Sequence, residues 1–211
     1  MSDEILAAAR AIANEWRGLA AAWHIIVAAL VVVLWRRRVD GRAIAAGLAL
    51  MPLSVATMAA WSGNPFNITM FVALGLVMLA LAGTDVSAQL RVAGARDVAA
   101  GAVMCSFGWV YPHFLDGPAW QYLYAAPLGL LPCPTLALLM GVSLLTDSFG
   151  SKTWAILVGS MGMLYGLIGV FVLGVTIDWW LMAGAAGLLA RAAAPLRLVE
   201  AVPLDREKRP V

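Results

Sequence analysis

The sequence predicts an all-α protein, a polytopic bundle of about seven transmembrane helices. Hydrophobic residues fill 63% of the 211 positions and charged residues only 12%, about half the charged share of a typical soluble domain. Apolar runs of roughly 20 residues, the length that a helix needs to cross a bilayer, recur along the chain. The net charge of +2 comes without a basic face, which argues against nucleic acid as a partner and leaves membrane lipids as the expected surroundings.

The apolar runs also predict the domain organisation. Residues 1–18 mix charges with Leu and Ala at helical spacing, which predicts an amphipathic helix in the membrane interface. Residues 19–193 form a single predicted transmembrane domain, and residues 194–211 a charged cytoplasmic tail. The predicted crossings are about 19–35, 43–61, 68–83, 98–111, 122–145, 153–173 and 179–190. The first and last are short, so six crossings is the alternative.

The basic residues predict the orientation. With seven crossings, only Arg10 and Arg17 of the 14 Lys and Arg residues fall on one side. The other 12 share the opposite side: Arg36, Arg37, Arg38, Arg42, Arg91, Arg96, Lys152, Arg191, Arg197, Arg206, Lys208 and Arg209. Because the positive side of a membrane protein faces the cytoplasm, we expect a bacterial inner-membrane protein with its N-terminus outside and its C-terminus in the cytoplasm.

The fifth predicted crossing contains a stretch that a continuous helix does not tolerate. Pro132 and Pro134 flank Cys133, and Pro127 precedes them. Proline lacks a backbone N–H and clashes with the preceding turn, so the helix is expected to break at Cys133. A broken backbone inside a bilayer needs protein or a water-lined cavity to satisfy its polar groups. We therefore expect a site there, unless the prolines only kink the helix around a neighbour.

The position of the break predicts its chemistry. Counted from Tyr122, Cys133 lies roughly 16 Å along a helix, near the bilayer midplane. Thr135 is expected to lie at the start of a cytoplasmic half-helix, with Pro134 at its first position and Cys133 near its cap. Free amide groups and the dipole of such a half-helix favour an anion or an electron-rich group, and the thiolate form of Cys133.

Three further side chains are candidates for the same site. Tyr165 is the lone polar side chain in the middle of the sixth crossing, and its hydroxyl is expected to bond to carbonyl groups freed by the break. Asn67 and Asp178 lie next to the outer ends of predicted crossings. Together with Cys133 and Thr135 they form the predicted ligand-binding set.

The sequence identifies no cofactor and predicts no metal site. The weak candidate ligands are Cys105, Cys133 and His113, of which the two thiols are soft ligands of the kind that Cu(I) prefers.

Glycines recur on two predicted helices at spacings of three, four or seven residues. They are Gly159, Gly162, Gly166 and Gly169 in the sixth crossing, and Gly94, Gly101 and Gly108 in or near the fourth. Small residues let helices approach closely. These faces predict helix packing within the chain, or docking onto a second copy or a larger membrane complex.

Three stretches of the sequence carry a resemblance. They are Asn64 to Asn67, Leu131 to Thr135, and Gly174 to Asp178. These stretches resemble an uncharacterised prokaryotic family of polytopic membrane proteins, catalogued as a domain of unknown function. The similarity spans about residues 60–190, and the Pro-Cys-Pro-Thr motif is its most specific part. Since that family has no assigned activity, the resemblance implies a shared site of Asn67, Cys133, Thr135 and Asp178 but no reaction.

The sequence therefore predicts a protein that binds or translocates a small solute between the fifth crossing and the third, sixth and seventh. In this hypothesis Thr135 and the half-helix amides contact the ligand, Asn67 and Asp178 face the outer entrance, and Tyr165 braces the break. One alternative is a membrane-embedded thiol enzyme or redox module that uses Cys133. Another is a non-catalytic accessory subunit of a larger complex.

Overall fold

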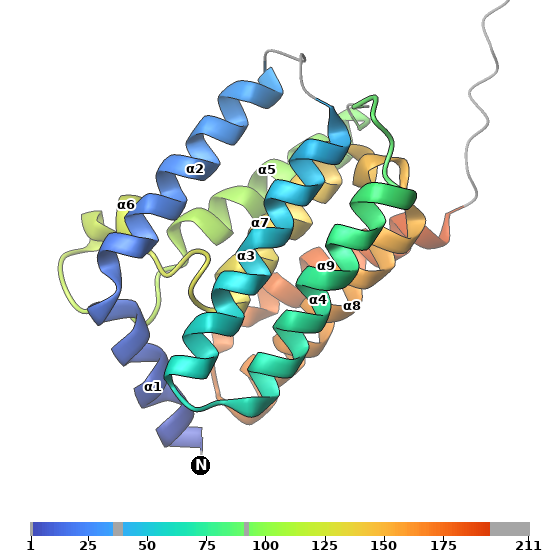
Figure 1. The fold of residues 1–211 in the computed structure, drawn as a ribbon. Helices are drawn as coiled ribbons and strands as arrows, with labels where there is room; N and C mark the ends of the chain where they lie inside the picture. The colour runs from blue at the N-terminus through green and yellow to red at the C-terminus, as the bar shows by residue number, and fades with distance from the viewer. Residues whose placement is uncertain (1, 36–39, 91–92, 195–211) are drawn as a thin grey trace, which may run out of the picture.

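All regular structure in the described part of the chain is helical (Figure 1). The computed structural model describes residues 2–35, 40–90 and 93–194. The predicted tail, apart from its first residue, lies outside the described residues. The helices are α1 (Ser2–Glu15), α2 (Arg17–Trp35), α3 (Gly41–Trp61), α4 (Pro65–Thr84), α5 (Ala95–Val110), η1 (Ala119–Gln121), α6 (Tyr122–Ala125), α7 (Pro132–Leu145), η2 (Asp147–Gly150), α8 (Lys152–Leu167), η3 (Ile168–Val172), η4 (Thr176–Asp178) and α9 (Trp179–Ala193).

Helix α7 is the centre of the bundle. It is apolar on every side and its residues 134–144 are all buried, as expected of a helix surrounded by other helices. It packs against α3, α5, α8 and α9. Further extensive contacts join α3 to α4 and α8 to α9, and α3 and α4 run side by side in Figure 1.

Three of the described helices are long and apolar enough to cross a membrane: α3, α4, and α8 continued by η3. Helices α1 and α2 together add a fourth if they are counted as one crossing, although they are bent by 72°. Helices α5, α7 and α9 have only 16, 14 and 15 residues, fewer than the roughly 20 that span a bilayer. The count of seven crossings is therefore not confirmed. In the predicted fifth crossing, residues 126–131 are apolar but not helical, which shortens α7.

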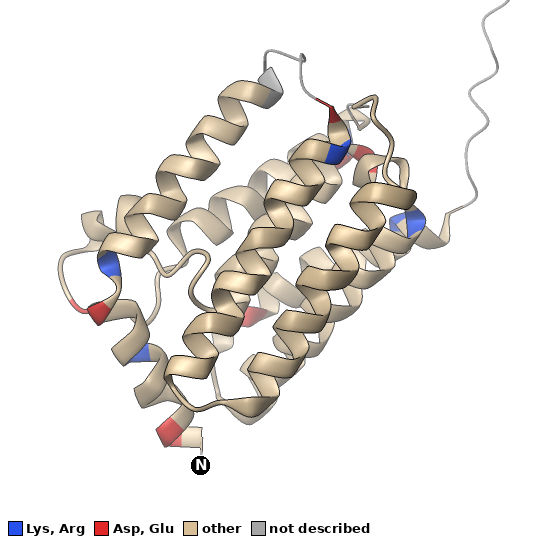
Figure 2. Cartoon of the chain, viewed as in Figure 1, with Lys and Arg blue, Asp and Glu red and all other residues tan. Residues whose placement is uncertain are grey.

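The charged residues of the described part of the chain lie mainly toward the two ends of the bundle (Figure 2). At one end, Arg191 forms ion pairs with Asp97 at 3.2 Å and Asp147 at 2.5 Å. At the other end, Arg17 donates a hydrogen bond to the carbonyl oxygen of Asp116. Arg42, near the start of α3, lies at the same end as Arg191, because the N–H of Gly41 bonds to Ala88 and that of Ser87 to Phe149 in η2.

The non-helical backbone lies before Cys133 rather than at it. Helix α6 has only four residues, and residues 126–131 are buried and non-helical; we call these six residues the break. Helix α7 then begins at Pro132, so the prediction that Pro134 takes the first helical position is wrong by two residues. Both prolines fit the first turn because amide groups there have no acceptor within the helix.

Neighbouring helices cover most of the predicted glycine positions. A Cβ atom added to Gly101 would lie 2.8 Å from the carbonyl oxygen of Gly141, so α5 and α7 touch backbone to backbone there. The side chain of Leu189 in α9 fills the space over Gly159 in α8. The prediction of packing within the chain is confirmed at these positions, whereas Gly94 has no neighbour within 4 Å.

Candidate functional site

Buried side chains hold the backbone of the break. The Thr135 hydroxyl donates to the carbonyl oxygen of Leu131 at 2.7 Å and accepts from the N–H of Gly129 at 3.0 Å. Gly129 has a φ of +71°, and the ring of Trp23 lies where its side chain would be. Thr135 is fully buried, so its hydroxyl serves the break rather than a ligand.

Replacing Thr135 with valine tests this role. Valine keeps the shape of threonine but removes both hydrogen bonds and leaves the buried N–H of Gly129 without its acceptor. We expect Thr135→Val to lower the free energy of unfolding by about 1–2 kcal/mol, measured by chemical unfolding in mild detergent. The control is Thr57→Val, because Thr57 is exposed on α3 and bonds only to the carbonyl of Leu53. An equal loss in both variants would contradict the role of Thr135.

Three polar side chains from distant parts of the chain meet where α7 begins. Oδ1 of Asp178 accepts a hydrogen bond from the Tyr111 hydroxyl at 2.7 Å, and Oδ2 accepts one from the Cys133 thiol at 3.2 Å. We call these three residues the carboxyl cluster. Asp178 is 1% exposed and holds the only buried carboxyl group among the described residues. A buried carboxyl group with two specific hydrogen-bond donors is a candidate functional group.

Burial controls the protonation of the carboxyl cluster. Asp178 ends η4, in the connection between η3 and α9, and burial raises its pKa to about 6 although its two hydrogen bonds lower it. Gly169 in η3 provides the space for the carboxyl group, because a Cβ atom there would overlap Oδ2 of Asp178. The π-helical turn η3 is a geometry often found at functional sites.

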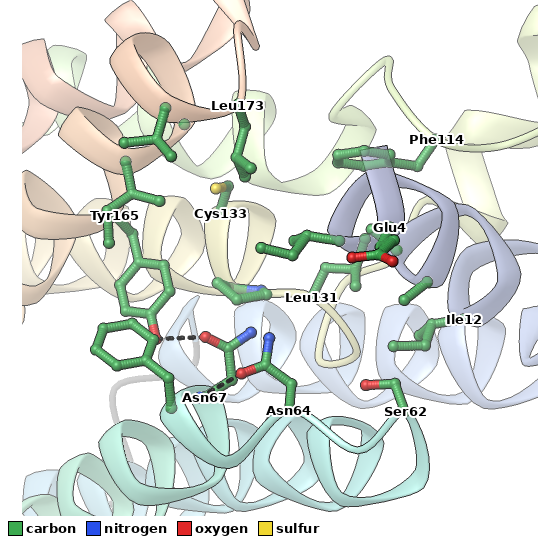
Figure 3. A pocket seen from close by; sticks show the side chains of 18 of the residues that line it. Glu4, Ile12, Ser62, Asn64, Asn67, Phe114, Leu131, Cys133, Tyr165 and Leu173 are labelled. Atoms are coloured by element: carbon green, nitrogen blue, oxygen red, sulfur yellow. Dashed lines mark hydrogen bonds between the residues drawn. The ribbon is translucent and has the colours of Figure 1, made fainter. Parts of the chain in front are cut away.

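A cavity of about 390 Å³ lies beside the carboxyl cluster. Its wall is mainly apolar and comes from α1, the α3–α4 turn with the start of α4, the first turn of α7, α8 and η3, with Phe114 from the loop after α5 (Figure 3). The polar side chains on the wall are those of Glu4, Ser62, Asn64, Asn67, Cys133 and Tyr165. Cys133 belongs to both the wall and the carboxyl cluster, so it connects the two.

Tyr165 bonds to a side chain rather than to the break. Its hydroxyl donates to Oδ1 of Asn67 at 2.8 Å, across the cavity wall from α8 to α4 (Figure 3). The predicted bond from Tyr165 to a backbone carbonyl is therefore wrong. Two carbonyl groups of the break already have other partners. The N–H of Leu131 donates to the carbonyl of Pro127 at 3.0 Å, and the Thr135 hydroxyl donates to the carbonyl of Leu131.

The structure brings together three of the five predicted site residues. Asn67, Cys133 and Tyr165 line the cavity. Asp178 contacts Cys133 but is not on the wall, and Thr135 lies beneath the break. The fifth and sixth predicted crossings contribute to the wall as expected, whereas the third contributes none of its residues 68–83, because the lining residues of α4 end at Asn67. No residue of the seventh lines the wall, and α1 does so instead.

The start of α7 offers few free amide groups. Pro132 and Pro134 have no N–H, and the N–H of Leu131 is already bonded. Only the N–H of Cys133 remains in the first turn for an outside partner. The half-helix therefore has little of the anion-binding capacity that its position suggested.

Sequence reasoning missed Tyr111, Asn64 and the first helix as parts of the site. Tyr111 follows an apolar run as interfacial aromatic residues do, and no local signal shows that it is buried against Asp178. The amphipathic pattern of α1 does indicate an apolar face. That pattern alone does not distinguish a face toward lipid from one toward a cavity.

The weak metal-ligand candidates do not form a cluster. The described residues contain no group of three His, Cys, Asp or Glu side chains placed to hold a metal ion. Cys105 packs against Gly141 of α7, roughly 12 Å along that helix from Cys133 at 1.5 Å per residue. His113 packs its ring against Phe114, with 4.2 Å between ring centroids.

The described chain is thus an all-helical bundle in which some helices are apolar enough to cross a membrane, with a cavity beside a buried carboxyl cluster. Comparisons with protein-family models, curated proteins and solved structures find no match to this chain. The family resemblance stays a prediction, and any functional proposal rests on the geometry of the chain's own residues.

Proposed function

We propose that this protein binds or translocates a small solute in the cavity beside the break. The observation that carries the proposal is a cavity of about 390 Å³ at which Asn67, Cys133 and Tyr165, from three separate helices, converge. That volume and its mainly apolar wall with a few polar groups are typical of small-molecule sites. The buried carboxyl group of Asp178, which is hydrogen-bonded to Cys133 on the wall, supports the same proposal.

The proposal places the protein in the inner membrane of a bacterium. Helices α2, α3, α4, α5, α7, α8 and α9 are proposed as seven crossings, with the short ones completed by the break and by loops buried in the bundle. The end of the bundle with Arg42 and Arg191 is proposed to face the cytoplasm, because basic residues favour that side. The cavity, which α1 and the α3–α4 turn border, then lies toward the outer side.

The two alternative functions find less support in the geometry. The Cys133 thiol donates a hydrogen bond to the Asp178 carboxylate, so deprotonating the thiol would place two negative charges 3.2 Å apart. This arrangement favours the thiol over the nucleophilic thiolate that an enzyme needs. For an accessory subunit, the glycines at 101 and 159 offer no docking face, because α7 and α9 already cover them.

Filling the cavity tests the proposal. Ala8 lines the cavity from α1, and its neighbour Ala7 is exposed and does not. We expect the wild-type protein, extracted with its lipids in polymer nanodiscs, to carry a small molecule detectable by native mass spectrometry. Ala8→Phe should reduce its occupancy roughly tenfold, which corresponds to about 1.4 kcal/mol, whereas Ala7→Phe should leave it unchanged.

Two outcomes would contradict the proposal. One is that no bound molecule is found and none of the added probes described below binds. The other is binding that Ala7→Phe and Ala8→Phe affect equally, because the ligand would then lie outside the cavity.

A further inference from the structure

We infer that the cavity takes an uncharged, mostly apolar molecule with a carbonyl-type oxygen, which the side-chain amides of Asn64 and Asn67 recognise. This inference rests on the proposed function, since it names the class of solute for the same cavity. It depends on which end of each amide group faces the cavity.

Hydrogen bonding fixes the orientation of the Asn64 amide. Asn64 caps the N-terminus of α4, and its Oδ1 accepts the backbone N–H of Asn67 at 3.0 Å. A backbone N–H only donates, so the atom facing it must be the oxygen. The NH₂ group is therefore at the other end, which Figure 3 shows turned toward the cavity on the side of Leu131.

The Asn67 amide has the same orientation in the structure, with its oxygen toward the Tyr165 hydroxyl, a group that can donate or accept. Its Oδ1 accepts the Tyr165 hydroxyl at 2.8 Å, and its nitrogen points into the cavity beside that of Asn64 (Figure 3). Neither amide nitrogen makes a hydrogen bond to another described residue. Two neighbouring NH₂ groups thus offer donors to the cavity, while both amide oxygens are occupied.

The donors and the charges on the wall determine which chemical class of ligand the cavity can bind. A pair of donors binds an acceptor oxygen and gives nothing to the N–H groups of a cation. No Lys or Arg lines the cavity among the described residues, so no cationic side chain on the wall would pair with an anion. The first turn of α7 adds only one free N–H. A neutral carbonyl, as in an ester, ketone or quinone, remains as the acceptor that fits.

The rest of the wall fits the apolar part of such a molecule. Ile5 and Ile12 of α1, Phe114, and Val172 and Leu173 near the end of η3 border the cavity. These side chains offer only hydrophobic contact, which stabilises a ligand in proportion to the apolar area removed from water. The cavity therefore combines one hydrogen-bonding site, the amides of Asn64 and Asn67, with a mainly apolar wall.

A series of probes with one ten-carbon chain tests the inference. The purified full-length protein in detergent is incubated with tritiated methyl decanoate, which is displaced by unlabelled methyl decanoate, decane, decanoate or decylamine. We expect the ester to compete at least about tenfold better than each of the other three. Displacement by a phospholipid would identify membrane lipid as the natural source, and its failure a free carbonyl compound.

Matched variants assign the effect to the two amides. Asn64→Asp keeps a helix cap of equal quality but loses the NH₂ group, and Asn67→Asp keeps the acceptor for Tyr165. Each is expected to weaken binding of the ester about tenfold. Gln89→Glu, an amide-to-acid change at an exposed residue that does not line the cavity, should have no effect.

The outcomes separate this inference from the proposed function. If ester and decane bind alike and Ala8→Phe abolishes both, the cavity binds solutes but the amides do not select them, and the inference is overturned. Tightest binding of decanoate or decylamine also overturns it. If no probe shows binding that depends on Ala8, the proposed function fails and the inference fails with it.

Discussion

Gly169→Ala is expected to lower the free energy of unfolding by about 1–3 kcal/mol. The added methyl group overlaps Oδ2 of Asp178, and overpacking of a core costs about 1–3 kcal/mol. If the carboxyl group moves instead, the buried donors of Tyr111 and Cys133 lose their acceptor, at about 1–3 kcal/mol for each unpaired group. Chemical unfolding in mild detergent measures the change.

The control for this variant is Gly187→Ala. Gly187 lies in α9 with no atom within 4 Å of a Cβ built there. Alanine favours a helix over glycine by up to about 1 kcal/mol, so the control should be as stable as the wild type or slightly more stable. A Gly169→Ala protein of wild-type stability would show that Asp178 does not need this space.

The stability of the wild-type protein is expected to fall by about 2.5 kcal/mol more than that of Asp178→Asn between pH 4 and pH 8. Burial raises the pKa of Asp178 from 3.8 to about 6, so the folded state favours the protonated carboxyl. That contribution is complete below pH 3.8 and is lost as the pH rises through about 6. The groups that face the Asp178 carboxyl are the Tyr111 hydroxyl and the Cys133 thiol, which both donate to it, and Gly169 in η3, which has no side chain.

Asp116→Asn provides the control for the pH experiment. Asp116 is exposed in the loop after α5, so its replacement should leave the pH dependence of the wild type in place. Unfolding is measured for all three proteins at several pH values in one detergent. Equal pH dependence in the wild type and Asp178→Asn would show that Asp178 does not titrate in this range.

The features that the sequence predicted are those that local chemistry determines. Composition and run length predicted an all-helical protein, and the prolines around Cys133 predicted an interrupted backbone. The proline effect did not determine the register, because a proline is tolerated anywhere in a first turn. The helix therefore starts at Pro132, two residues earlier than expected.

The features that the sequence did not predict depend on contacts between distant residues. Tyr111 and Asp178 are 67 positions apart, and nothing near either residue identifies the other as its partner. Tyr165 and Asn67 are 98 positions apart; both were candidates, but only packing of α8 against α4 selects this bond over one to the break. The lengths of α5, α7 and α9 likewise depend on their contacts with the rest of the bundle, and not on the length of the apolar run alone.

The position of α1 has a practical consequence for producing the protein. Asn14 bonds to the carbonyl of Phe114 at 2.9 Å and accepts from the N–H of Asp116 at 2.9 Å, which anchors this helix to the loop after α5. Ile5 and Ile12 on the anchored helix then close one side of the cavity. Expression vectors that trim the first dozen codons would remove Ile5 and Ile12, and so open this side of the cavity. Screening for ligands is therefore best done with affinity handles at the opposite terminus.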